Sequence, residues 1–167
     1  MFNYNPPGLN TSPEERKYLW ILELIWWLIS LVLLAAVMYP ILSEVEKYPF
    51  AGLNMVIILL FFHYFRHVAF LKYSALRMFF WSKFFLALIT VPLLFVIVGQ
   101  FGYFQTFMDE HSMSEIMPDL SYNQQVSLNR FIKIQMVFFF TAAVISGGLF
   151  VLRMMVSMWR QVNEKGF

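Results

Sequence analysis

The sequence predicts an all-α integral membrane protein: four transmembrane helices in an antiparallel bundle, with both termini cytoplasmic. Of its 167 residues, 60% are hydrophobic and 13% are charged, whereas about a quarter of the residues in soluble domains are charged. Four apolar segments are each long enough to cross the hydrocarbon core, which takes about 20 helical residues. Lysine and arginine also concentrate on one side of these segments, as the positive-inside rule expects.

The first predicted span covers residues 18–42, and its helix is expected to begin in water. Ser12 offers a capping side chain, and Pro13 suits the first helical position. Glu15, three residues after the serine, completes a capping-box pattern. We therefore expect the helix to start one or two turns before the membrane.

The second and third predicted spans cover residues 50–71 and 79–101. Only the segment "KYSALR" and Met78 lie between them. A linker this short predicts that the two helices are antiparallel neighbours.

The fourth predicted span covers residues 131–152 and follows an external loop over residues 102–130. Ser121 and Gln124 repeat the capping pattern inside this loop. The last helix is therefore expected to start outside the membrane and to run continuously into it. The stretch "SMSEIM", ended by Pro118, predicts a short interfacial helix. Residues 1–167 would form a single membrane domain.

The basic residues orient the predicted bundle. Nine of the twelve Lys and Arg fall on one side and three on the other, and the richer side faces the cytoplasm. The nine are Arg16, Lys17, Arg66, Lys72, Arg77, Lys83, Arg153, Arg160 and Lys165, and the three are Lys47, Arg130 and Lys133. Both termini are therefore predicted to be cytoplasmic, and the expected location is a bacterial inner membrane.

Five ionisable residues within the spans form the candidate site, an intramembrane polar cluster of Glu23, His63, Arg66, His67 and Lys83. Charges in hydrocarbon cost about 3 kcal/mol or more each, so they usually face the bundle interior and pair with one another. Glu23 and Arg66 are expected at similar depth in the inner leaflet, and they are predicted to form an ion pair. The remaining residues would give the cluster a net basic character, suited to an anionic headgroup, a haem propionate, a quinone carbonyl or an acidic partner.

His63 and His67 lie four residues apart and therefore share one face of the second helix. Two interpretations stay open for them. They are hydrogen-bonded core histidines, which is the commoner case, or they line an interhelical site that opens to the inner leaflet. Metal chemistry is not predicted, because histidine-box di-iron sites need several such pairs and this chain has three histidines.

Small residues in the fourth span predict close helix packing. Ala142 and Ser146 are four residues apart, and so are Ala143 and Gly147. This spacing lets helix backbones approach each other within a membrane.

Several function classes lack their sequence signatures. The chain has no cysteine, which excludes disulfides and thiolate sites, and its net charge of +2 gives no support for nucleic-acid binding. Phosphate-loop, nucleophile-elbow, zinc-protease and dinucleotide motifs are missing. Asp109, His111 and Glu115 are interpreted as part of a solvated acidic loop rather than as a cation site.

The expected function is a non-catalytic accessory or scaffold subunit of a larger membrane complex, not an enzyme on its own. Its partners would be membrane lipids and other membrane subunits, without nucleic acid. One alternative is a membrane anchor of an electron-transfer complex, in which His63 and His67 would bind haem or quinone. Another is a small proton-coupled transporter or channel, with Glu23 and the histidines as a proton relay.

Overall fold

The computed structural model describes residues 12–45, 48–111 and 113–163, and all regular structure in these ranges is helical. Lys47 and Lys165, which contribute to the predicted orientation, lie outside the described residues. Four long helices, α1 (Pro13–Leu42), α2 (Ala51–Phe70), α3 (Phe80–Glu110) and α5 (Tyr122–Asn163), carry the fold. Each belongs to a helical segment long and apolar enough to cross a membrane. The short elements are η1 (Leu71–Tyr73), η2 (Ala75–Met78) and α4 (Met113–Ile116).

Local side-chain chemistry sets where α1 and α5 begin. The Ser12 hydroxyl accepts a hydrogen bond from the Glu15 N–H at 3.2 Å, and the Glu15 carboxylate accepts the Ser12 N–H at 3.2 Å. This confirms the capping box and starts α1 ahead of the predicted span. At α5, the Gln124 amide oxygen accepts the Ser121 N–H at 3.1 Å and the Ser121 hydroxyl at 2.6 Å.

The helices extend beyond the apolar segments that predict them. α3 continues to Glu110 and α5 begins at Tyr122, so most of residues 102–130, predicted as an external loop, is helical. The four-residue α4 lies in the short connection between α3 and α5. Met117, which directly follows α4, is 2% exposed.

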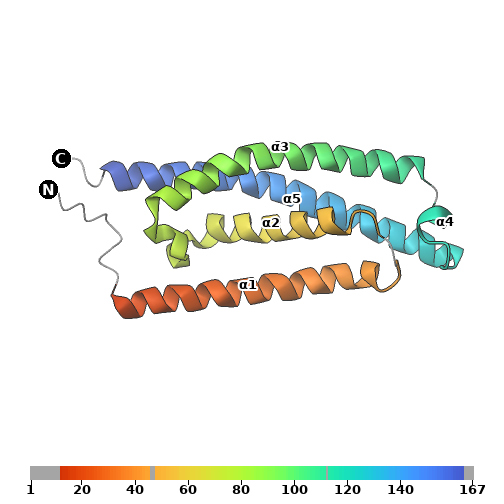
Figure 1. Cartoon of the computed structure of the whole chain (residues 1–167), viewed down its shortest axis with the longest axis horizontal. Coiled ribbons are helices and arrows are strands. Elements are labelled where there is room, and N and C mark those ends of the chain that lie inside the picture. The colour runs from red at the N-terminus through yellow and green to blue at the C-terminus, as the bar shows by residue number, and fades with distance from the viewer. Residues whose placement is uncertain (1–11, 46–47, 112, 164–167) are drawn as a thin grey trace.

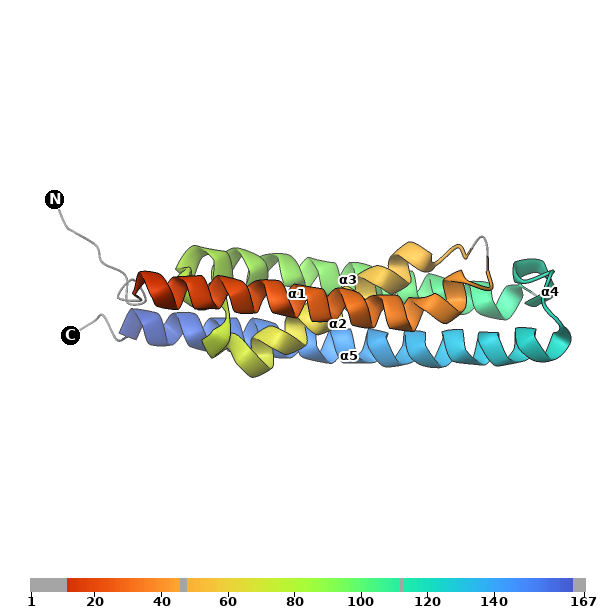
Figure 2. The same ribbon diagram turned by 90° about the horizontal axis from the view of Figure 1, so that it is seen from below.

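The two ends of the bundle differ in content (Figures 1 and 2). One end, here called the linker end, holds the start of α1, the end of α5, and η1 with η2. The opposite end, here called the α4 end, holds α4 and the turn between α1 and α2. Every long helix runs between these two ends.

Helix α5 is the centre of the packing. Both α2 and α3 pack mainly against α5, and α1 packs mainly against α2 (Figure 1). The predicted neighbours α2 and α3 share few backbone contacts, because both pack mainly against α5, but their side chains meet, as Tyr64 and Leu94 do beside Gly147. The linker allows this separation because η1 and η2 are joined by an extended residue, Ser74, instead of forming one tight turn.

The core consists of two clusters of buried side chains along α5. The cluster toward the α4 end includes Ile41, Ile57, Ile132 and Phe139. The cluster toward the linker end includes Leu71, Leu76, Phe150 and Met154. The candidate site adjoins this second cluster.

Candidate functional site

A buried ion pair joins α1 to α2. The Arg66 guanidinium on α2 donates to the Glu23 carboxylate on α1, and their side chains are 5% and 18% exposed. The same carboxylate oxygen accepts the backbone N–H of Ala75 at 3.3 Å, at the start of η2. Glu23 therefore holds three elements together, and its charge is balanced within the protein.

Aromatic rings shield this pair. The Arg66 guanidinium lies 5.9 Å from the centroid of the Trp26 ring, within the range of a cation–π contact. Trp26 also packs against Phe70, with ring centroids 5.4 Å apart. Rings on both helices thus exclude solvent from the ion pair, which strengthens its electrostatic attraction.

The two histidines pack together next to the ion pair. The rings of His63 and His67 are 4.5 Å apart, and His67 Nδ1 donates to the His63 carbonyl oxygen at 2.7 Å. This hydrogen bond places a proton on Nδ1, because a carbonyl can only accept. The His63 ring faces Trp27 of α1 at 6.2 Å, and both imidazoles contact Phe150 of α5.

The space beside the two histidines is small. The hollow that His63 and Arg66 share with Trp26, Trp27 and Ser30 has a volume of about 10 Å³. That is about the room of one water molecule. A site that opens to the inner leaflet therefore stays a prediction, and the structure limits its size, because Trp26 and Trp27 of α1 line the hollow beside α2.

Lys83 lies at a different helix interface from the other four residues of the cluster. Its side chain is fully buried, and its ammonium donates to the Ser157 hydroxyl on α5 at 3.0 Å. Its grouping with Glu23 and the histidines is therefore corrected. Helix α3 packs mainly against α5, and the Lys83 ammonium accordingly reaches a side chain of α5.

The small residues of α5 differ in how closely they approach other helices. A Cβ added at Gly147 would lie 2.8 Å from Cδ2 of Leu94 on α3 and 3.1 Å from Cε2 of Tyr64 on α2. Ser146 is buried, and its hydroxyl donates to the Ala143 carbonyl of its own helix at 3.3 Å. Ala142 is only half-buried. Gly147 is therefore the point where α2, α3 and α5 meet.

Two buried amides toward the α4 end are not part of the sequence-based site. Asn54 on α2 is fully buried near the Tyr48 hydroxyl, and Gln135 on α5 is 6% exposed with no hydrogen-bond partner for its amide among the described residues. Asn54 is a polar residue inside the apolar run "GLNMVIILL", and this pattern could have identified it as a buried polar residue from the sequence.

Neither metal-ligating side chains nor known proteins identify a cofactor. Within the three described ranges, no group of three or more His, Asp and Glu side chains could hold a metal ion. Comparisons of the chain with protein-family models, curated proteins and solved structures found no match. The geometry shows a tightly packed polar cluster that joins α1 to the rest of the bundle.

Proposed function

We propose that this chain is an integral membrane protein whose four long helices cross the bilayer as an antiparallel bundle, with both termini in the cytoplasm. Arg16, Lys72 and Arg160 belong to elements at the linker end, whereas Arg130 and Lys133 lie toward the α4 end. The linker end is therefore the cytoplasmic side by the positive-inside rule. The same bias fits the inner membrane of a bacterium.

Within that membrane, the chain serves as a non-catalytic accessory or scaffold subunit of a larger complex. The observation that carries this proposal is the engagement of Glu23, which accepts from both Arg66 and the Ala75 backbone. The acid that could have served chemistry or proton transfer is used instead to fix α1 against α2 and the linker. Buried ionisable groups in a membrane are commonly paired in this way.

The cavity beside His63 supports a structural role over a cofactor anchor. Pockets for cofactors and other small ligands measure about 300–1,000 Å³, whereas this hollow has about 10 Å³. A haem or quinone here would have to displace Trp26 and Trp27 from the α1–α2 interface.

The distribution of buried polar groups supports a structural role over transport. Toward the α4 end lie Asn54 and Gln135, and toward the linker end lie His67, Thr90 and Ser146. Between these two layers α2, α3 and α5 contribute buried apolar side chains, namely Ile57, Ile58, Ile97, Phe139 and Ala143. A proton or ion would have to cross this dry layer without a polar partner.

Docking surface is available at the linker end. The start of α1 and the last turns of α5 lie there, beyond the predicted spans, and Trp159 is 65% exposed with Arg160 exposed beside it. Exposed aromatic and arginine residues are the types that most often anchor protein interfaces.

Cross-linking in native membranes followed by affinity purification of the tagged full-length chain tests this proposal. We expect other membrane polypeptides to be recovered in a fixed ratio. Trp159→Ala with Arg160→Ala should reduce their recovery. Tyr122→Ala with Val126→Ala, exposed at the opposite end of α5, should not. Recovery of the chain alone, or with visible haem absorbance, would overturn the proposal.

A further inference from the structure

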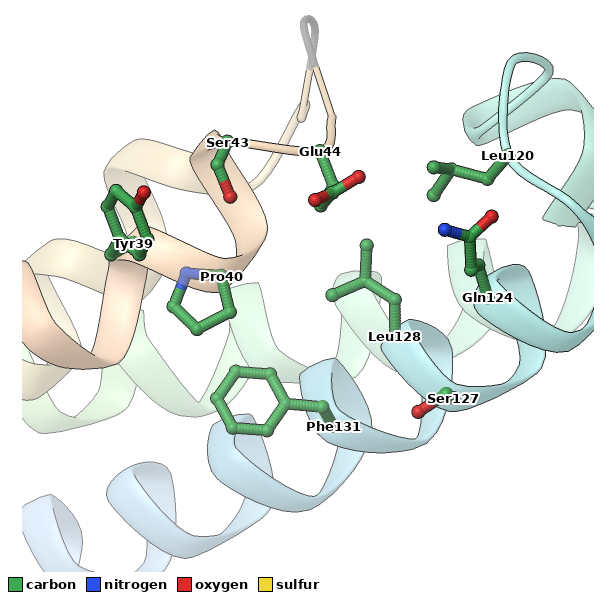
Figure 3. Close-up of a pocket in the computed structure, with 9 residues that line it drawn as sticks. All are labelled: Tyr39, Pro40, Ser43, Glu44, Leu120, Gln124, Ser127, Leu128 and Phe131. Carbon is green, nitrogen blue, oxygen red and sulfur yellow. The ribbon is translucent and has the colours of Figure 1, made fainter.

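A groove separates α1 from α5 near the α4 end (Figure 3). Its volume is about 500 Å³, and it is far larger than the hollow beside His63. Helix α1 supplies Tyr39 and Pro40, followed by Ser43 and Glu44 of the turn after it. The opposite wall is made by Leu120, Gln124, Ser127, Leu128 and Phe131.

The groove has a carboxylate and an amide nearer one end, although apolar Leu120 also lies at that end and the Tyr39 hydroxyl lies at the other. Glu44 and Gln124 lie toward the α4 end, whereas Pro40 and Phe131 lie closer to the middle of the bundle (Figure 3). On α5 the wall extends from Gln124 to Phe131, about 10 Å at the α-helical rise of 1.5 Å per residue. A bilayer leaflet makes a similar transition, because its polar headgroup region is about 5–8 Å deep above the hydrocarbon.

Charge is complementary to one class of headgroup. Glu44 is exposed to the groove and forms no ion pair with any described residue, and the residues that line the groove include no lysine or arginine. Its carboxylate can accept hydrogen bonds from a primary ammonium group. The hydroxyls of Ser43 and Ser127 and the Gln124 amide can donate to a phosphate.

We propose that this groove binds a phospholipid whose headgroup carries a primary ammonium, with the ammonium at Glu44 and the first acyl carbons against Pro40 and Phe131. The inference rests on the proposed placement of the chain in a membrane. An anionic headgroup without an amine would bring its negative charge next to Glu44 and is disfavoured.

The size of the groove favours a lipid over a helix of a partner protein. A helix with its side chains is about 10–12 Å wide and would need contact along many turns. The groove instead covers two turns of α5 and the last turn of α1. A headgroup with its glycerol fits this short, partly polar space.

Native mass spectrometry of the purified full-length chain in mild detergent can measure lipid binding and so test the proposal. The probes are phosphatidylethanolamine, phosphatidylcholine and phosphatidylglycerol with identical acyl chains. We expect the first to bind about two- to fivefold more tightly than the other two, the range of one exposed ion pair. Glu44→Gln should remove this preference.

Two further variants make the result specific. Glu110→Gln, an exposed acid at the end of α3 that does not line the groove, should keep the preference. Ser127→Trp, at an exposed position of the groove wall, should block tight binding with Glu44 intact and with an unchanged far-UV circular dichroism spectrum. Equal affinity for the three lipids, or equal effects of Glu44→Gln and Glu110→Gln, would overturn the proposal.

A photo-crosslinking residue in place of Ser127 distinguishes the lipid from a protein occupant in native membranes. A lipid adduct supports the proposal, and a polypeptide adduct overturns it in favour of a partner segment. Because the affinity measurement uses the isolated chain, its outcome does not depend on whether the chain is a subunit of a complex.

Discussion

At the scale of single residues, the Glu23–Arg66 pair decides how α1 attaches to the bundle. Removing one partner leaves the other charge buried without compensation, which is far more costly than removing both. Arg66 is the less exposed of the two, and Glu23 also holds the linker through Ala75. The attachment of α1 therefore depends on both charges together.

We expect Glu23→Gln alone to lower the free energy of unfolding by about 3–5 kcal/mol, because Arg66 is left buried and unpaired. The double variant Glu23→Gln with Arg66→Gln should cost clearly less than the sum of the two single changes. Reversible unfolding in mixed micelles of detergent and denaturing surfactant measures each value and gives the coupling energy.

The exposed pair Asp109–Lys133, with a nitrogen–oxygen distance of 3.1 Å, is a matched control. Its two side chains are 74% and 41% exposed, respectively, so its coupling energy should stay below about 1 kcal/mol. Equal coupling energies for the two pairs would show that burial of Glu23 and Arg66 contributes nothing.

At the scale of secondary-structure elements, α5 organises the fold because two other helices pack onto it. Gly147 has no side chain, so Leu94 of α3 and Tyr64 of α2 can both approach the same turn of α5. The neighbouring Gly148 faces open space. Two adjacent glycines in one helix therefore have different roles.

Gly147→Val should destabilise the protein by about 1–3 kcal/mol relative to Gly148→Val, which is the usual cost of overpacking a core. The physical reason is that valine at Gly147 would force Leu94 and Tyr64 apart, whereas valine at Gly148 meets no other atoms. Thermal unfolding of both variants in the same detergent compares them directly. If the two melting temperatures agree, α2 and α3 do not converge on this turn.

At the scale of the whole molecule, the two ends of the bundle carry different charges and different structures. The linker end gathers the basic residues of α1, η1 and α5. The α4 end carries acidic side chains around a second hollow of about 350 Å³, among them Glu44, Glu115 and Asp119. This asymmetry is the basis for the orientation proposed above.

Reporter fusions test that orientation. A fusion after Lys72 or at the C-terminal end of the chain should show cytoplasmic activity, because the basic residues hold the linker end inside. A fusion within residues 111–121 should show the opposite. A fluorescent protein and alkaline phosphatase, each fused at these three sites, should give opposite signals, because the first is active in the cytoplasm and the second outside it. A C-terminal end that reports as external would contradict the orientation.

The sequence by itself determined the four long helices and where α1 and α5 begin. Hydropathy and capping are local properties, so Ser12 with Glu15 and Ser121 with Gln124 could be identified without knowing any neighbour. The ion pair of Glu23 with Arg66 could also be predicted by counting along single helices. Because Glu23 is the only acidic residue within the predicted spans, it was the one candidate partner for Arg66 there.

Only the tertiary structure decided which helices touch. A helix that is apolar on all sides carries little information about which face meets lipid and which meets protein. The packing of both α2 and α3 against α5 could not be predicted from the short linker, and it accounts for the contact of Lys83 with Ser157 rather than with the histidines. The filling of the histidine site by Trp26 and Trp27, and the groove beside Glu44, depend in the same way on how far α1 lies from its neighbours, a distance set by side chains remote in the sequence.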